Sequence, residues 1–219
     1  MQDIGKAFTY MFEDENWITK ILLGGVFVLL SFILVGIPFI IGFMIVTIQN
    51  VLAGRPKPLA EWDNLGDKFV KGLLLGIALI VWYIPSLVIS MVGSFLPAIA
   101  GPKDGGPLVL LGLLFSCVAF IYNIALAFIL PAIFLQYAVN PNIGSAFQFN
   151  EIFSMVTRNI GNFVIVFLLS LVASIIASFG FIALCVGVLF TLFWAELVQA
   201  YLYGQLGVAG GKGTPSAII

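Results

Sequence analysis

The 219 residues are 62% hydrophobic and only 9% charged, with a mean hydropathy of +1.18 and a formal net charge of −1. A soluble domain carries about 25% charged residues. This chain therefore has too few polar side chains to cover a water-soluble globule, and we expect the lipid bilayer to be its main partner. The absence of a basic tract argues against a nucleic-acid partner, and the absence of histidine removes the commonest general base and metal ligand.

Residues 3–17 are expected to form an amphipathic helix at the membrane interface. Asp3 is placed to cap its start, where free N–H groups need an acceptor, and Trp17 would anchor its end at the interface. The apolar positions that recur at helical spacing are Ile4, Phe8, Met11 and Phe12.

The first apolar run carries no charge from Ile21 to Asn50. As one helix it would be about 45 Å long at 1.5 Å per residue, which exceeds a hydrocarbon core of about 30 Å. Gly36-Ile37-Pro38 lies in its middle, and proline disfavours a helical residue before it. We therefore expect a hairpin of two short spans, residues 19–35 and 38–53.

Two further hairpins follow. The second joins the runs 73–100 and 108–139 through the Gly- and Pro-rich turn 101–107. The third is the apolar region 160–208, which is too long for one span and divides near Phe179-Gly180. The tail 210–219 is expected to be irregular.

A short pattern of Asp/Asn, Ile/Leu, Gly, any two residues and Phe, which we call the Gly–Phe box, precedes each hairpin. Its copies begin at Asp3, Asn64 and Asn142, and each hairpin closes with a glutamine, Gln49, Gln136 or Gln199. The chain is thus expected to be one membrane domain, 1–219, of three repeated units. The bounds of these units are about 3–54, 64–141 and 142–204. Because all three boxes lie on the same side of the membrane, the units are parallel rather than inverted repeats.

The basic residues support a topology with both termini inside. If the boxes are cytoplasmic, Lys103 is the only basic residue outside, as the positive-inside rule demands. The fold class is therefore expected to be all-α with six transmembrane helices, N-in and C-in, in the cytoplasmic membrane of a prokaryote. The residues assigned to the inside are Lys6, Lys20, Arg55, Lys57, Lys68, Lys71, Arg158 and Lys212.

Glu196 is the strongest candidate for a functional residue, because it is the only charged residue within the expected membrane spans. Intramembrane carboxylates are costly and often form proton or cation sites. Gln199 and Tyr203 share its helical face at i+3 and i+7. The structural alternative is that Glu196, about two turns from the end of the span, reaches interfacial water or a neighbouring hydroxyl.

Serines recur at i, i+4 and i+8 in the first spans of units two and three. Small residues at this spacing let helices approach closely, and packing is favoured over a pore lining. A buried amide, Asn123, most often makes an interhelical hydrogen bond. The two serine rows are Ser86, Ser90 and Ser94, and Ser170, Ser174 and Ser178.

Trp62 lies between Glu61 and Asp63 and is expected to anchor this segment at the membrane interface. The alternative is that the three residues form an exposed acidic and aromatic patch that binds a partner. Cys117 and Cys185 sit in apolar runs without Cys-x-x-Cys spacing, so two small buried residues are favoured over a disulfide or metal site. No catalytic residue, cofactor or metal is expected, because the chain contains no nucleophile motif, phosphate loop or metal-ligand cluster.

The first 72 residues resemble a family of prokaryotic membrane proteins known only as a domain of unknown function. The resemblance lies in Asp3-Ile4-Gly5-Lys6-Ala7-Phe8, in Gln49-Asn50-Val51-Leu52-x-Gly54 and in Pro58-Leu59-x-Glu61-Trp62-Asp63. It implies a helical protein with several membrane spans, and it brings no catalytic or binding residues.

The leading functional hypothesis is a non-enzymatic membrane protein that acts by packing or interaction, as an accessory or structural subunit of a larger assembly or as a homo-oligomer. The alternative is a small transporter or channel that uses Glu196 and the Ser and Gln stripes. A third, weaker class is a lipid-handling protein.

Overall fold

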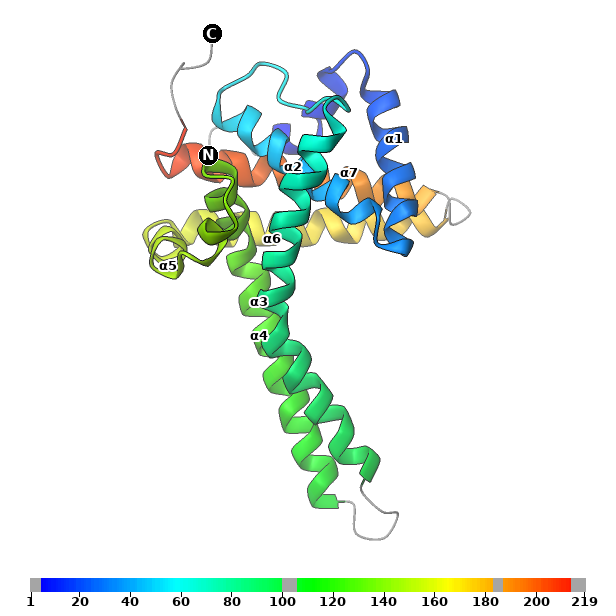
Figure 1. Ribbon diagram of the computed structural model, residues 1–219, viewed down its shortest axis with the longest axis vertical. Helices are drawn as coiled ribbons and strands as arrows, with labels where there is room; N and C mark the ends of the chain where they lie inside the picture. The colour runs from blue at the N-terminus through cyan, green and yellow to red at the C-terminus, as the bar shows by residue number, and fades with distance from the viewer. Residues whose placement is uncertain (1–4, 100–105, 183–186, 214–219) are drawn as a thin grey trace.

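The computed structural model describes residues 5–99, 106–182 and 187–213, and this part of the chain is helical (Figure 1). Two long helices form an arm that projects from a head built by the other elements. The α-helices are α1 (Trp17–Leu30), α2 (Gly36–Leu52), α3 (Leu65–Ile99), α4 (Gly106–Val139), α5 (Phe149–Arg158), α6 (Ile160–Ser178) and α7 (Gly187–Ala209).

The N-terminal segment differs from the expected amphipathic helix. It forms two short 3-10 helices, η1 (Gly5–Phe8) and η2 (Tyr10–Glu13). The side chain of Tyr10 is buried and donates a hydrogen bond to the carbonyl of Leu197 on α7, 3.0 Å away. The helix prediction for 3–17 is wrong because this long-range contact and the burial of Ala7, Tyr10 and Met11 decide the backbone course. Asp3 and Ile4 lie outside the described residues.

Helices α1 and α2 form the first expected hairpin. The connection passes through a 3-10 turn, Ser31–Ile33, and Leu34, which has a left-handed φ of 65°. Pro38 lies in the first turn of α2, where its missing N–H costs little. The predicted interruption is confirmed, and the chain turns just before Gly36.

Backbones of α2 and α3 touch where glycines face each other. A Cβ atom added at Gly42 would lie 2.0 Å from the carbonyl oxygen of Lys68, and one at Gly72 would lie 1.7 Å from that of Pro38. These positions therefore accept only glycine without a shift of the backbone.

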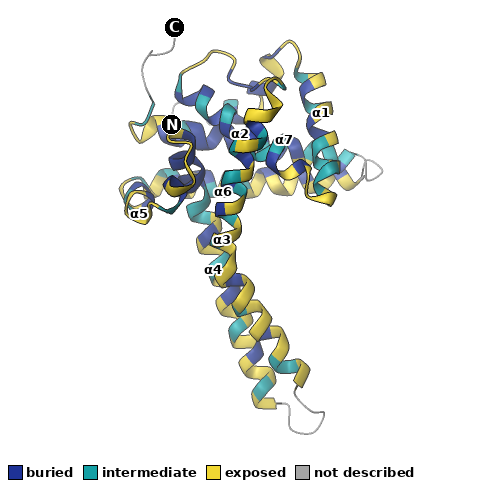
Figure 2. Cartoon of the chain, in the orientation of Figure 1, coloured by how far each residue is buried: buried dark blue, intermediate teal, exposed yellow. Residues whose placement is uncertain are grey.

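Helices α3 and α4 form the arm and pack along a seam with alternating spacings of three and four residues, as in a coiled coil. Gly93 and Gly112 bring the helices close together, since a Cβ at Gly112 would lie 2.6 Å from the ring of Pro97. Figure 2 shows exposed residues along most of the remaining surface of the arm. The seam consists of Leu75, Ala78, Trp82, Ser86, Ile89 and Gly93 on α3, and of Gly112, Phe115, Ala119, Tyr122 and Leu126 on α4.

Helix α7 is the centre of the head and is buried on most sides, as a helix without an amphipathic pattern should be. It contacts α1, α2, α4 and α6. Phe193 packs over Gly24 of α1, and Gly204 meets Val51 of α2. The division of region 160–208 near Phe179-Gly180 is confirmed, because α6 ends at Ser178 and a 3-10 turn follows.

Three helical stretches are long and apolar enough to cross a membrane, namely Leu65–Ile99, Gly106–Val139 and Ile160–Phe181. Shorter apolar stretches are Trp17–Ile33 and Gly36–Leu52. The 35 residues of α3 correspond to about 52 Å, more than the hydrocarbon core of about 30 Å requires. In Figure 1, α6 and α7 run across the axis of the arm.

The Gly–Phe boxes take two local forms. The first and third are the 3-10 helices η1 and η4 (Ile143–Phe147), whereas the second begins α3. In each copy the residue before the phenylalanine is buried: Ala7, Lys68 and Ala146. Gly66 and Gly144 do not provide close backbone approach between elements, because a Cβ at Gly66 would meet nothing within 4 Å and one at Gly144 would meet only the side chain of Asn142 at 3.4 Å.

Substitution of Gly72 by alanine should destabilise the head, because the added methyl group collides with backbone atoms of α2. Overpacking of this kind costs about 1–3 kcal/mol, measured as a lower unfolding midpoint in detergent. Gly66→Ala in the first turn of the same helix is the matched control and should leave the midpoint unchanged or raise it. Equal effects of the two substitutions would contradict the proposed glycine contact.

Candidate functional site

A long apolar groove runs between α2 and α3. It has a volume of about 560 Å³ and is lined by Leu34 in the turn before α2, by residues from Ile37 to Ile41 on α2 and by residues from Gly72 to Leu87 on α3. Gly72 and Gly76 supply part of the α3 wall. Gly76 leaves space beside the helix, because a Cβ there would meet only the side chain of Ile41 at 3.6 Å, whereas Gly72 is in contact with the backbone of α2.

The groove adjoins a second, smaller cavity of about 290 Å³ that reaches α7. The two cavities share four lining residues, which are Ile37, Ile41, Leu79 and Tyr83. The structure therefore places the apolar groove along α3 next to a cavity that reaches α7, with these four side chains bordering both.

Glu196, Gln199 and Tyr203 line this second cavity together, so the structure brings the three polar residues of α7 to one place. The hydroxyl of Tyr203 donates to Oε1 of Gln199 at 3.0 Å. No hydrogen bond or ion pair to the Glu196 carboxylate is present within residues 5–99, 106–181 and 187–213. The remaining walls of the cavity are apolar apart from Tyr83.

The serine rows contribute less to packing than their spacing indicates. Ser86 is buried and accepts a 2.7 Å hydrogen bond from Nδ2 of Asn123, which joins α3 to α4. Ser90 and Ser94 are exposed. On α6 the contact face is made by Phe163, Val166, Ser170, Ala173 and Ala177, while Ser174 and Ser178 are exposed and donate to carbonyls of the preceding turn.

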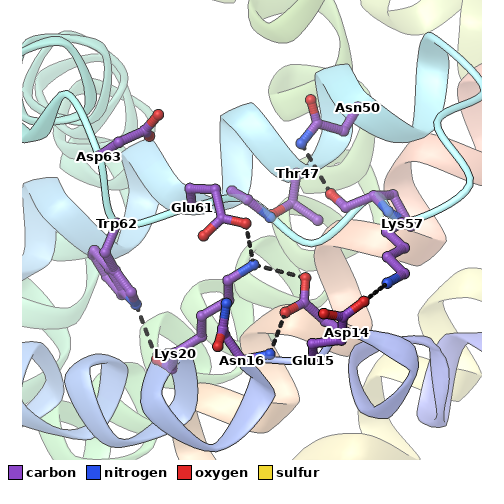
Figure 3. A network of polar contacts seen from close by, with 12 residues as sticks. Asp14, Glu15, Asn16, Lys20, Thr47, Asn50, Lys57, Glu61, Trp62 and Asp63 are labelled. Carbon is purple, nitrogen blue, oxygen red and sulfur yellow. Dashed lines mark hydrogen bonds and ion pairs between the residues drawn. The ribbon is translucent and has the colours of Figure 1, made fainter.

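The loop that follows α2 is fastened to the head by a polar network that sequence inspection missed (Figure 3). The ammonium group of Lys20 is buried and donates to Asp14 at 2.7 Å and to Glu61 at 2.5 Å. Further along the same loop, Asn50 donates to the carbonyl of Pro58 at 3.0 Å. The signal was the cluster Pro58-Leu59-x-Glu61-Trp62-Asp63, whose residues bind helices of the same chain.

Trp62 is held inside an aromatic cluster instead of facing the interface alone. Its ring centroid lies 4.6 Å from that of Phe27 and 4.4 Å from that of Phe43, and its indole donates to the carbonyl of Lys20 at 2.9 Å. Asp63 accepts from Lys68 at 2.7 Å. The acidic and aromatic patch is therefore largely satisfied within the chain. Trp17 is half-buried, and its ring packs edge-on against Phe12.

The lysines of this network lower the pKa of two carboxyl groups, Asp14 before α1 and Asp63 in the loop after α2. Burial acts to raise the pKa of Asp14, but the hydrogen bonds from Lys20 and from the N–H of Asn16 outweigh it and hold the pKa below its usual value. The hydrogen bond from Lys68 likewise lowers the pKa of Asp63. Both carboxylates thus support stability as anions.

A polar pocket of about 530 Å³ lies beside this network, where the ends of α2 and α4 meet the start of α3. Its lysines have partners: Lys68 binds Asp63, Lys71 binds Asp67 at 2.8 Å, and Lys212 donates to Oε1 of Gln136. It gathers several of the basic residues that the charge distribution assigns to the inside.

The comparison with known families gives one match. The model of a protein of unknown function, DUF4013, covers residues 21–186. The chain belongs to the DUF4013 family. No curated protein and no solved structure matches it.

The resemblance to a domain of unknown function is therefore confirmed, and its extent bears on the site. The DUF4013 match includes both walls of the apolar groove, on α2 and α3, but it ends before α7 begins at Gly187. Glu196 consequently lies outside the part that the family describes.

Metal ligation has no support in the described residues, which contain no cluster of three acidic, histidine or cysteine side chains. Cys117 is free and exposed, and Cys185 lies outside the described residues.

Replacement of Lys20 by methionine should destabilise the head strongly, because it leaves the nearly buried carboxylate of Asp14 without its cation. Removing one partner of a buried pair costs about 3–5 kcal/mol, measured by denaturant unfolding in micelles. The control is Lys57→Met, which breaks an exposed 2.7 Å pair with Glu15 and should change the free energy of unfolding far less, because water solvates both charges. Similar losses in both variants would show that the Lys20 network is not structural.

Proposed function

We propose that the protein is a non-enzymatic, multi-pass membrane protein that takes up a lipid-like molecule from the bilayer into the groove between α2 and α3. The observation that carries this proposal is the apolar groove of about 560 Å³, which adjoins the cavity at Glu196 and shares four lining residues with it. A groove of this kind, lined by apolar side chains with a few convergent polar groups at one end, is typical of ligand sites.

The position of the groove supports access from lipid. Ile80, Ile84 and Leu87 line it and are also among the exposed apolar residues of the arm. In water such a surface would be an aggregation hazard, whereas in a bilayer it is solvated by acyl chains. An acyl chain can therefore move from the bilayer into the groove without crossing polar surface.

The proposed topology has six spans with both termini inside, and the charge distribution supports it. The arm α3/α4 and helix α6 have the length and composition of spans. The crosswise course of α6 and α7 in Figure 1 means that these two helices would cross at a strong tilt.

Cysteine labelling tests this topology in a variant with Cys117 and Cys185 replaced by serine. Gly106→Cys at the tip of the arm and Phe181→Cys after α6 should both react with a membrane-impermeant maleimide added outside intact cells. Gly66→Cys, on the side of the Gly–Phe boxes, should be protected until the membrane is opened. Labelling at residue 106 with protection at residue 181 would show that α6 and α7 do not cross the bilayer.

A second candidate function is an accessory subunit, as expected from the sequence. The outer faces of the arm favour it, since they carry large exposed side chains such as Leu87, Met91 and Phe95. These faces would pack against other membrane subunits or a second copy. Recovery from native membranes only as an isolated monomer would contradict this candidate.

A transporter is the remaining alternative. The protein would then carry its ligand across the bilayer, and the flux of ligand into liposomes would stop in the variant Glu196→Gln.

Filling the groove tests the leading proposal. A Cβ at Gly76 would make ordinary contact with Ile41 at 3.6 Å, so Gly76→Leu should fold while its side chain occupies the groove. Calorimetric titration of dodecanol into nanodiscs that hold the protein should show saturable binding, weakened about ten-fold or more in this variant, because a filled pocket loses apolar contact worth about 1.5–3 kcal/mol. Gly66→Leu, outside the groove, is the control. Unchanged binding in Gly76→Leu would remove the groove from consideration.

A further inference from the structure

Glu196 occupies an unusual electrostatic position. Its carboxylate faces a cavity walled by α2, α3 and α4, and the polar groups there are Gln199, Tyr203 and Tyr83. None of these is a cation, and the Tyr203 proton is engaged by Gln199. A carboxylate in such surroundings is stable only if it binds a proton or pairs with a positive charge.

The cations of the described chain are committed elsewhere or lie at the polar pocket. Lys20, Lys68 and Lys71 are paired with aspartates. Arg55 and Lys212 line the polar pocket, which does not share residues with the Glu196 cavity. No lysine or arginine of the described residues lines the Glu196 cavity, so the carboxylate there takes either a proton or a positive charge from outside the chain.

We propose that Glu196 binds the cationic head of a single-chain amphiphile, such as an alkylammonium, whose apolar chain lies in the groove between α2 and α3. This inference rests on the proposed function and adds the chemical class of the ligand. The groove and the cavity adjoin at their four shared residues, so the head of a molecule whose chain lies in the groove would be placed on the side of the carboxylate.

Two features of the cavity support an ammonium head over a neutral one. The carboxylate provides the only negative charge in its lining, and the aromatic ring of Tyr83 stands at the junction with the groove. Aromatic faces attract ammonium groups, and the attraction is stronger where water is excluded. A neutral alcohol would fill the groove equally well but would leave the carboxylate uncompensated.

The test compares two ligands of equal chain length, dodecyltrimethylammonium and dodecanol, titrated calorimetrically into nanodiscs with the protein. The permanently charged head avoids any titration of the ligand itself. Empty nanodiscs measure partitioning into lipid alone. The quaternary head has no N–H to donate and is held by charge attraction, which is strong where water is excluded. The native protein should therefore bind the ammonium on the order of 10–100 times more tightly than Glu196→Gln does.

Dodecanol should bind the native protein and Glu196→Gln equally, which also shows that the variant is folded. Glu151→Gln carries the same change on the exposed face of α5 and should leave both affinities unchanged. If dodecanol binds but the ammonium shows no dependence on Glu196, the inference fails, the proposed function stands and a proton is the partner of the carboxylate. If neither ligand binds, the proposed function fails as well.

Discussion

The contact between the backbones of α2 and α3 at Gly42 and Gly72 is the constraint on which the rest of the head depends. A carbonyl of each helix lies where the Cβ of the opposite residue would be, so no larger residue fits. The same contact places Lys68, whose carbonyl faces Gly42, with its side chain buried and bound to Asp63. It thereby fixes the start of α3 relative to the loop that precedes it. The groove follows directly, because its lining on α3 begins at Gly72.

Much of the helical framework could be predicted from the sequence, because proline, glycine and the length of apolar runs act locally. The interruption before Pro38 and the division of region 160–208 needed no knowledge of tertiary contacts. The N-terminal segment and the loop after α2 were different. Tyr10 bonds to Leu197, and Trp62 bonds to Lys20 and lies against Phe43. Such partners lie far away in sequence, so periodicity predicted a helix for 3–17, and residue type alone did not reveal the aromatic cluster around Trp62.

The serine rows show why residue type alone is a weak guide to packing in lipid. A serine hydroxyl can be satisfied by a carbonyl of its own helix, as Ser174 and Ser178 are, and can then face outward at little cost. The positions that hold α3 against α4 are instead those where the absence of a side chain matters, such as Gly93 and Gly112. Ser86 belongs to the seam because Asn123 requires an acceptor across it. Which serine of a row packs against a neighbouring helix depends on the residues of that helix. The spacing of the serines in the sequence does not contain this information.

The site at Glu196 differs from the polar network of the loop in how its acidic side chain is compensated. The loop acids Glu61 and Asp63 have lysine partners from α1 and α3, and these ion pairs fasten the loop. Within the described residues Glu196 has no such role: its cavity contains no cation, and its side chain holds no other segment in place. A glutamine or leucine there would avoid the cost of desolvating a carboxylate, so the glutamate lowers the stability of the empty protein. Such a loss is understandable where the residue acts on a ligand, because sites of function commonly reduce stability. The carboxylate and the apolar groove then have one explanation, in which each accommodates one end of the same molecule.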